Sequence, residues 1–438
     1  MYVIPVLKRL LLVFLLAMLV LPSIQGCFRF SKEAGLNGSF VPAPYPVITW
    51  ADLRDNTYQP ALEQYLAEQL GFRPYLVRFR NQLLYSLFRV AKSHDIVVGL
   101  RQVLFQPAPI GSYLGHDRLP AAEIRFRVRR LRAVQRALGR RGVQLLFVLA
   151  PNKARYQPED LPGHLQPAPG TVTNYDLFRQ AMRADSVALL DLIPVFARWK
   201  NTKPYPLFPR DGIHWSGYGA TLAADTLLRQ LEQLGHLRFP TVRTVGPPRI
   251  AYKAAGLRGT DNDLGWLLNV MYLPDPTPLA YRQLAFDPPR PGQTRPSALF
   301  VGDSFVWALM LVSPYMQREF ADGTRFWYYN NAVHIPDSTY HDTGEKVGNL
   351  DLRQQLESRR FVIVLVTEHN LVENEFGFTE QVYRLYHPFS ATDQTAINQL
   401  ATKMAADAPW EEQTKDPAAF AQRIHEQARA RYEREHLR

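Results

Sequence analysis

The chain holds a single cysteine, Cys27, among its 438 residues. Disulfide bonds within the chain therefore cannot stabilise its fold, and both a thiol nucleophile and a cysteine-based zinc site are excluded. The sequence also lacks a His-Glu-x-x-His string or any other close cluster of histidines and carboxylates. We expect neither a metal ion nor another cofactor.

Motifs of nucleic-acid binding are missing as well: there is no zinc-finger spacing, no RNP-like segment and no basic heptad region. The chain is nevertheless basic, because 51 Lys and Arg residues outnumber 40 Asp and Glu residues and give a net charge of +11. This charge suits an acidic partner such as an anionic polysaccharide or a phospholipid surface. We expect no nucleic acid among the partners.

Repeats and low-complexity tracts are absent too, and 46% of the residues are apolar. The composition is that of a folded protein, long enough for two domains. The one long hydrophobic run lies at 10–21, after Lys8 and Arg9, and no further charge occurs before Arg29. This pattern predicts an uncleaved single-pass anchor in the cell inner membrane, with the rest of the chain on the periplasmic, extracytoplasmic side. A cleaved signal peptide and a lipidated Cys27 are the alternatives.

The whole chain divides into four predicted regions. The anchor occupies 1–28, a tether and a helical lead-in occupy 29–115, an α/β domain occupies 116–390, and a charged helical tail occupies 391–438. Apolar runs typical of buried parallel strands alternate with amphipathic helices in the α/β domain, as at 143–150, 186–192, 298–301, 326–329 and 361–366. A proline-rich excursion at 235–296 interrupts this alternation. The pattern predicts one parallel sheet with helices on both faces.

Ser304 is the candidate nucleophile. It ends the string Phe300-Val-Gly-Asp-Ser304, which combines a buried strand with a glycine and is followed by an apolar helix. A hydroxyl at this point projects at the carboxyl end of a parallel sheet, where open α/β folds bind ligands. The alternative is a serine that only caps the following helix.

A candidate proton acceptor lies about ninety residues earlier, in Asp211-Gly-Ile-His214-Trp215. If Asp211 and His214 share one helical turn, the carboxylate can orient the imidazole through one ring nitrogen. The other nitrogen can then take the proton of Ser304 and return it to a leaving group. The alternative is a surface aspartate next to a core histidine.

The order of these two motifs is the reverse of that in ordinary SGNH (GDSL) hydrolases, where Gly-Asp-Ser comes first and Asp-x-x-His last. The chain therefore resembles circularly permuted members, the polysaccharide O-acetylation proteins of the alginate O-acetyltransferase group, AlgX/AlgJ type. Further matches lie at 69–73, 98–105, Pro151–Pro162 and Gly259–Leu264. The resemblance implies an SGNH-hydrolase-like, flavodoxin-like fold that is circularly permuted.

Donors for an oxyanion hole are sought at the same edge of the sheet. The backbone N–H of Ser304 is one candidate. The resemblance suggests Asn370, at the place of the family's Gly-x-Asn block, and Asn330 or Asn331 after the strand at 326–329, although an asparagine can equally cap a loop. Lys153 and Arg155, at the end of the strand at 143–150, are candidates for holding an anionic sugar group, with solvated loop cations as the alternative.

The function that the resemblance implies is O-acetyl transfer to an exported polysaccharide or a cell-surface glycan through an acylated Ser304. It also implies a membrane-bound O-acyltransferase as the partner that supplies acetyl groups. Two alternatives stay open: an esterase or deacetylase that uses the same triad with water, and a catalytically silent glycan-binding subunit. The sequence leaves the glycan, the acetylated hydroxyl and the oligomeric state undetermined.

Overall fold

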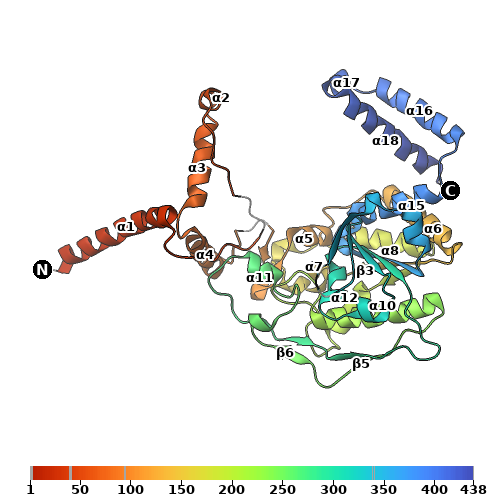
Figure 1. Ribbon diagram of the computed structural model, residues 1–438, viewed down its shortest axis with the longest axis horizontal. Helices are drawn as coiled ribbons and strands as arrows, with labels where there is room; N and C mark the ends of the chain where they lie inside the picture. The colour runs from red at the N-terminus through yellow and green to blue at the C-terminus, as the bar shows by residue number, and fades with distance from the viewer. Residues whose placement is uncertain (1–2, 39–41, 93–94, 338, 340, 438) are drawn as a thin grey trace.

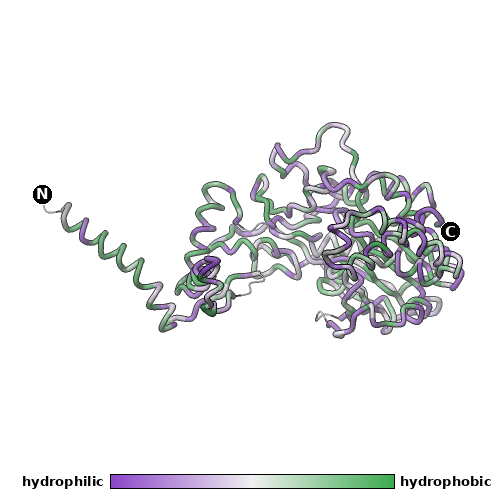
Figure 2. Tube along the Cα trace, turned by 90° about the horizontal axis from the view of Figure 1, so that it is seen from above, coloured by the Kyte–Doolittle hydropathy of each residue, from purple (hydrophilic) through white to green (hydrophobic). Residues whose placement is uncertain are grey.

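The computed structural model describes residues 3–38, 42–92, 95–337, 339 and 341–437. A long first helix, α1 (Val3–Phe28), projects from the rest of the molecule (Figure 1). Apolar residues predominate along it (Figure 2), and residues Val6–Phe28 are long and apolar enough to cross a membrane. Exposing this apolar surface to water is unfavourable, which agrees with the expected membrane anchor.

The core is a seven-stranded sheet in the order β12-β11-β10-β9-β13-β3-β4. The five strands from β10 to β4 are parallel, and β11 and β12 add an antiparallel edge. The strands are β3 (Gln144–Ala150), β4 (Leu189–Asp191), β9 (Ala298–Gly302), β10 (Arg325–Tyr328), β11 (Ala332–His334), β12 (Asp342–Lys346) and β13 (Phe361–Thr367). The apolar runs of the sequence thus form the centre of the sheet.

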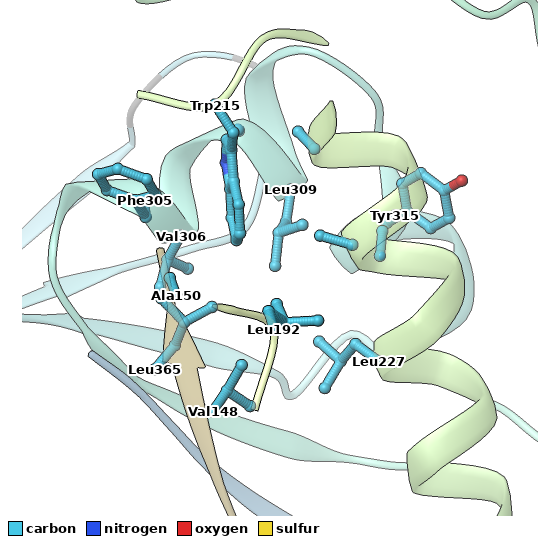
Figure 3. Close-up of a cluster of buried hydrophobic side chains, with 14 of the residues drawn as sticks. Val148, Ala150, Leu192, Trp215, Leu227, Phe305, Val306, Leu309, Tyr315 and Leu365 are labelled. Carbon is cyan, nitrogen blue, oxygen red and sulfur yellow. The ribbon is translucent and has the colours of Figure 1, made fainter. Parts of the chain in front are cut away.

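Helices cover both faces, because alternate residues of each buried strand point to opposite sides. Leu146 and Val148 of β3 belong to one apolar cluster, and Leu145 and Phe147 belong to the other. Figure 3 shows part of the first cluster, beside α10. The first face is covered by α9 (Ile193–Lys200), α10 (Gly217–Gly235), α12 (Ala308–Leu311) and α13 (Tyr315–Glu319), and the second by α6 (Ala121–Gly139), α8 (Asn174–Ala184), α14 (Leu352–Glu357) and α15 (Phe378–Tyr386).

The strand order shows the circular permutation. Of the strands in this sheet, β3 and β4 come first along the chain, yet β3 pairs with β13, which comes last. The strand before Ser304, β9, lies between β13 and β10. The predicted fold class, a permuted SGNH-like α/β sandwich, is therefore confirmed.

The excursion between the two halves of the sheet is more regular than the sequence suggested. It forms two small antiparallel pairs, β5 (Val242–Thr244) with β8 (Leu284–Phe286) and β6 (Arg249–Ala251) with β7 (Leu279–Tyr281). The helices η5 (Ala254–Gly256) and α11 (Asp263–Leu267) lie between β6 and β7 along the chain. Strands of three residues between prolines are too short to show a period in the sequence.

Before the sheet, the chain forms short elements: α2 (Trp50–Arg54), α3 (Tyr58–Gln69), α4 (Arg73–Leu83), the π-helical η1 (Leu84–Phe88), β1 (Val97–Val98), η2 (Leu100–Gln102), β2 (Leu104–Phe105) and α5 (Pro107–Tyr113). Residues 96–105 form a small hairpin of β1 and β2, with left-handed backbone angles at Arg101 and Gln102 in its turn. After the sheet, α16 (Ala391–Ala406), α17 (Trp410–Lys415) and α18 (Pro417–Glu435) form a helical unit that projects from the body (Figure 1).

Candidate active site

Ser304 begins the short helix η6 (Ser304–Trp307) directly after β9. The turn between them needs Gly302, because a Cβ there would lie 2.4 Å from the backbone oxygen of Leu365. Asp303 caps η6 by accepting a hydrogen bond from the backbone N–H of Phe305 (3.0 Å). These two constraints hold the hydroxyl of Ser304 at the carboxyl end of the sheet.

His214 lies against Ser304, with 2.7 Å between Nε2 and Oγ. Its loop is fixed by the next residue, Trp215, which is buried and packs edge-on against the ring of Phe305 (Figure 3). Ser216 then caps α10 by accepting a hydrogen bond from Gly219. The two motifs that the sequence separates by ninety residues are therefore in hydrogen-bond contact.

The carboxylate on the other ring nitrogen belongs to Asp263, with 2.9 Å between His214 Nδ1 and Asp263 Oδ2. The second oxygen of Asp263 accepts hydrogen bonds from the backbone N–H groups of Ile213 (2.9 Å) and Leu264 (2.8 Å). Asp263 thus holds both the imidazole and the chain beside it. A hydrogen bond from Nδ1–H leaves Nε2 free to accept the proton of Ser304.

Asp211, which the sequence suggested for this position, lies elsewhere. Its two oxygens accept hydrogen bonds from the guanidinium of Arg210, at 2.8 Å each. Residues 211–214 form an irregular loop and not a helical turn, so a spacing of three does not bring the two side chains together. The backbone oxygen of Asp211 accepts a hydrogen bond from Gly265, and Asp211 therefore helps to place α11.

Asp263 was missed because it belongs to the excursion, 49 residues from His214. The stretch Gly259–Leu264 is similar to a family segment. It also holds two other polar residues, Asp261 and Asn262, and the sequence does not tell which of the three contacts His214. Spacing cannot rank carboxylates that reach a site from a separate loop. The weak signal available was an acidic stretch in a region without helix or strand periodicity.

Lys153 does not face a substrate site. It is 3% exposed, and its ammonium group donates hydrogen bonds to the backbone oxygens of Leu104, Arg210 and Gly212 at 2.8, 2.8 and 2.9 Å. Burial lowers the pKa of Lys153 to about 7, while the negative charge of Asp211 acts in the opposite direction. Lys153 begins α7 (Lys153–Tyr156) and ties the loop before His214 to β2.

Arg155 is occupied in the same way. It forms an ion pair of 2.6 Å with Glu368, whose side chain is fully buried, and donates a hydrogen bond to Thr173. Burial raises the pKa of Glu368, and the guanidinium of Arg155 opposes this rise. The predicted sugar-binding role of Arg155 is therefore not what its contacts indicate, since its charge neutralises a buried carboxylate.

The three asparagines considered as oxyanion donors have other contacts or positions. Asn370 donates to Asp303 Oδ2 (2.8 Å), which also accepts from the backbone N–H of Thr367. The amide of Asn330 donates to the backbone oxygen of Phe376 and to Gln381. Asn331 is exposed, and its backbone pairs with the turn and with η7 (Val347–Asn349). Asn370 supports the residue before Ser304, and Asn330 fixes a loop.

Two further side chains lie near these residues, Tyr329 and His369. Tyr329, directly after β10, has a left-handed backbone (φ 48°), and its backbone N–H donates to Gly302. Burial raises the pKa of the Tyr329 phenol, and a hydrogen bond with Ser304 lowers this pKa by a smaller amount. His369, in η8 (Glu368–Gly377), is close enough to feel the charges of Asp303 and His214, and burial lowers its pKa. The predicted residues Asn330 and Asn370 each directly follow one of these two side chains in the sequence, but the sequence did not indicate Tyr329 or His369 themselves.

A groove of about 630 Å³ is lined by residues of the excursion and by the segment from Val312 to Arg318, and Ser304, His214 and Asp263 do not line it. Its lining includes Arg249, Arg258, Arg282, Arg318 and Tyr281. Arg258 lies over the ring of Tyr281 (5.2 Å), and a Cβ at Gly217, three residues after His214, would meet the same ring. Among the residues described, Arg282 pairs with Asp225, whereas no ion pair involves the other three arginines. The groove is therefore strongly positive.

Within the described ranges, no group of three or more His, Cys, Asp or Glu side chains is arranged to hold a metal ion. The chemistry available at this edge is that of an oxygen nucleophile with an oriented base. The arrangement can activate Ser304 for attack on an acyl carbon.

Part of the chain is similar to known proteins. Residues 111–312 match the family model described as "SGNH hydrolase-like domain, acetyltransferase AlgX". The "Probable alginate O-acetylase AlgJ" of Pseudomonas aeruginosa is 33% identical over 173 residues, which are 38% of this chain and 41% of that protein. The protein of the same name from Azotobacter vinelandii is 31% identical over 107 residues, 24% of this chain and 27% of that protein. The chain thus spans less than half the length of these curated relatives.

Solved structures are similar to the chain as well. The O-acetyltransferase domain of Pseudomonas putida AlgJ has a TM-score of 0.44 and 20% identity, covering 66% of this chain and 99% of that one. Pseudomonas aeruginosa AlgX has a TM-score of 0.42 and 14% identity, covering 66% of each chain. The matched residues 111–312 contain His214, Asp263 and Ser304, and this part of the chain is similar to the SGNH hydrolase-like domain of AlgX-type acetyltransferases.

Proposed function

We propose that this protein is an O-acetyltransferase that moves acetyl groups onto hydroxyls of an exported polysaccharide through an acyl-enzyme on Ser304. The observation that carries the proposal is the unbroken line of contacts from Ser304 through His214 to Asp263. A structural serine cap would not need an imidazole on its hydroxyl and a carboxylate behind that imidazole. The AlgX/AlgJ-type domain supports acetyl as the transferred group.

The residues support a two-step reaction. In the first step, His214 Nε2 takes the proton of Ser304, the Oγ attacks the acetyl carbonyl, and the donor's leaving group departs with the proton that the imidazolium returns. In the second step, His214 takes a proton from a sugar hydroxyl, whose oxygen attacks the acetyl-serine. The ester bond to Ser304 breaks, and its oxygen regains the proton. Asp263 stabilises the imidazolium in both steps.

The tetrahedral oxygen of each step needs donors that are already in place. The backbone N–H of Ser304 begins a helix, where the first N–H groups have no partner within the helix. The phenol of Tyr329, whose pKa is raised by burial and lowered by a smaller amount by the nearby Ser304 hydroxyl, is the second candidate. We propose this pair as the oxyanion hole, in place of the asparagines.

The acceptor in this proposal is an acidic polysaccharide. The relatives are named alginate O-acetylases, and alginate carries a carboxylate on each sugar. The arginine groove offers a matching positive charge, and arginine pairs well with carboxylates. Lys153 and Arg155, whose charges are already used, do not contribute to this surface.

The site faces the outside of the cytoplasmic membrane in this account. The apolar α1 provides the single-pass anchor, with Lys8 and Arg9 on the cytoplasmic side. Acetyl groups made in the cytoplasm must then cross the bilayer. A membrane-bound O-acyltransferase, implied by the family resemblance, is the proposed partner for that step.

The test incubates the purified full-length protein with an acetyl ester and acidic oligosaccharides and measures the products by mass spectrometry. We expect acetylated oligosaccharide from the wild type and none from Ser304→Ala. Ser358→Ala, which changes an exposed serine in another loop, is the matched control and should keep full activity. Release of acetate alone, with no acetylated sugar under any acceptor concentration, would show an esterase and contradict the transferase proposal.

A further inference from the structure

The helix α4 and the following turn η1 expose their apolar face to solvent. Phe79, Leu83 and Leu87 follow one another at steps of four residues, and their exposed fractions are 54%, 44% and 69%. Tyr75 and Leu76 extend the same stripe by one turn and are also exposed. Side chains at such spacing lie on one side of a helix. The stripe is therefore a continuous apolar surface.

The opposite side of the same helix is the one that packs on the protein, and part of it is polar. Asn81 is 8% exposed, and its amide donates hydrogen bonds to the backbone oxygens of Leu268 (3.0 Å) and Asn269 (3.3 Å). Tyr85, one turn later, is buried in a small cluster with Leu264 and Leu268. Because this side is fixed to the body, the apolar stripe cannot turn inward.

Two exposed side chains of a neighbouring loop continue the surface. Met271 is 59% exposed and Tyr272 is 67% exposed, and the backbone N–H of Tyr272 donates to Gln82 on α4. We call this set the α4 surface: Tyr75, Leu76, Phe79, Leu83, Leu87, Met271 and Tyr272. Contiguous exposed apolar patches of this kind mark sites that bind a membrane or another partner.

The location of α4 relative to α1 favours a membrane. Gly71, two residues before α4, donates its backbone N–H to the carbonyl of Pro22 in α1 (3.0 Å). Pro22 lies six residues before the end of α1, which is about 9 Å of helix rise. The contact is close, since a Cβ at Gly71 would lie 2.4 Å from Gln25. If α1 spans the bilayer, α4 begins beside the outer end of the spanning segment.

The charges of this segment favour a membrane as well. From Arg73 to Arg89 the sequence holds four arginines and no Asp or Glu. Basic helices with an apolar stripe lie in the interface of bilayers, and anionic lipids strengthen their binding. A tyrosine at each end of the α4 surface suits the boundary between headgroups and acyl chains.

We propose that the α4 surface lies in the outer interface of the membrane that α1 spans and binds anionic phospholipid there. The protein would then have two membrane attachments, a spanning helix and an interfacial one. Asn81 connects α4 to the end of α11, and α11 begins at Asp263. The second attachment would fix the orientation of the catalytic edge relative to the bilayer. The proposal does not depend on what reaction Ser304 performs.

The test uses the full-length protein in vesicles of phosphatidylcholine and phosphatidylglycerol. In a Cys27→Ser background, Leu83→Cys carries an environment-sensitive fluorophore, and the vesicles contain a lipid with a nitroxide quencher near the headgroup end of its acyl chain. The matched control probe is at Gln354→Cys, an exposed position on α14. A third protein combines the probe at position 83 with Phe79→Glu.

We expect the nitroxide to quench the probe at position 83 at least about threefold more than the probe at position 354, and Phe79→Glu to remove most of this difference. Equal quenching at the two positions would overturn the proposal. A probe at position 83 that is shielded only in native membranes, and not in pure lipid vesicles, would also overturn it, because a protein partner would then cover the α4 surface.

Discussion

At the scale of single residues, the carboxylate that contacts His214 belongs to Asp263 and not to Asp211. Asp263 orients the imidazole of His214, whereas Asp211 forms an ion pair with Arg210. Asp263→Asn should therefore lower kcat roughly 10³- to 10⁴-fold, since it removes the charge that orients and stabilises His214. Asp211→Asn should cost much less in kcat. Both are measured as hydrolysis or transfer of a small acetyl ester.

A thermal unfolding curve separates the two roles further. Asp211→Asn leaves the partly buried Arg210 without its carboxylate, so its Tm should fall more than that of Asp263→Asn. The assignment would be wrong if Asp211→Asn abolished turnover while Asp263→Asn kept most of it.

Lys153 provides a second prediction at this scale. Lys153→Met leaves three buried carbonyl oxygens without their donor and should lower the free energy of unfolding by on the order of 3 kcal/mol. Substrate binding should not be its main effect. Chemical denaturation of the two proteins measures the difference.

The same pair of proteins has a defined pH dependence. The pKa of Lys153 is lowered to about 7 by burial, whereas an unfolded lysine titrates at about 10.4. Between these values the unfolded chain binds more protons than the native one, so the contribution of Lys153 to stability rises with pH in this window and is lost as pH falls through about 7. The stability difference between wild type and Lys153→Met should increase from about pH 7 to about pH 10. A difference that decreases over this range would contradict the burial of the amine.

The sequence could predict Ser304 and His214 because each stands in a distinctive local string, next to a strand or a helix start. It could not predict Asp263, whose contact depends on how the loop from 259 to 264 folds over the site. Lys153 and Arg155 were identifiable as cations at a strand end. Their use as buried structural donors depends on the carbonyl groups and the carboxylate that the fold places around them.

At the scale of elements, the turn after β10 supplies the phenol of Tyr329 to the site. Tyr329→Phe should lower kcat roughly 10²-fold with little change in KM if the hydroxyl stabilises the tetrahedral oxygen. Tyr252→Phe, which changes an exposed tyrosine of the excursion, is the control and should stay near the wild type. A change in KM alone would instead place Tyr329 in substrate binding.

Long buried strands were the most predictable elements. β3, β9 and β13 are continuous apolar runs because helices cover both of their sides. The short strands of the excursion were not predictable, since three residues give no periodicity. The hairpin of β1 and β2 depends on the left-handed backbone at Arg101 and Gln102, which nothing in the sequence marks.

At the scale of the whole molecule, the order of the two motifs predicted a permuted sheet because it is the reverse of that in ordinary SGNH hydrolases. In the structure, β3 pairs with β13, the last strand of the sheet along the chain. The arginine groove was not predictable, because it is assembled from segments far apart in the chain. The exposure of the α4 surface was not predictable either, because it depends on which side of α4 packs on the body.

The groove makes its own prediction. The double variant Arg258→Glu, Arg318→Glu should raise KM for acidic oligosaccharides by about tenfold or more, since it replaces two attractive contacts by repulsive ones. Turnover of a small neutral acetyl ester should be unchanged. Arg353→Glu on α14, an exposed arginine outside the groove, is the matched control. An equal loss in the control would assign the effect to net charge and not to the groove.

The central claim is that Ser304 carries the acetyl group between donor and sugar. The most direct measurement is the mass of the full-length protein and of its Ser304 peptide after brief exposure to an acetyl ester, before and after addition of an acidic oligosaccharide. The account predicts one acetyl group on Ser304 that disappears as acetylated oligosaccharide forms, and no acetyl group in His214→Ala. Acetylated sugar formed without any acetyl on Ser304, or by the Ser304→Ala protein, would contradict it.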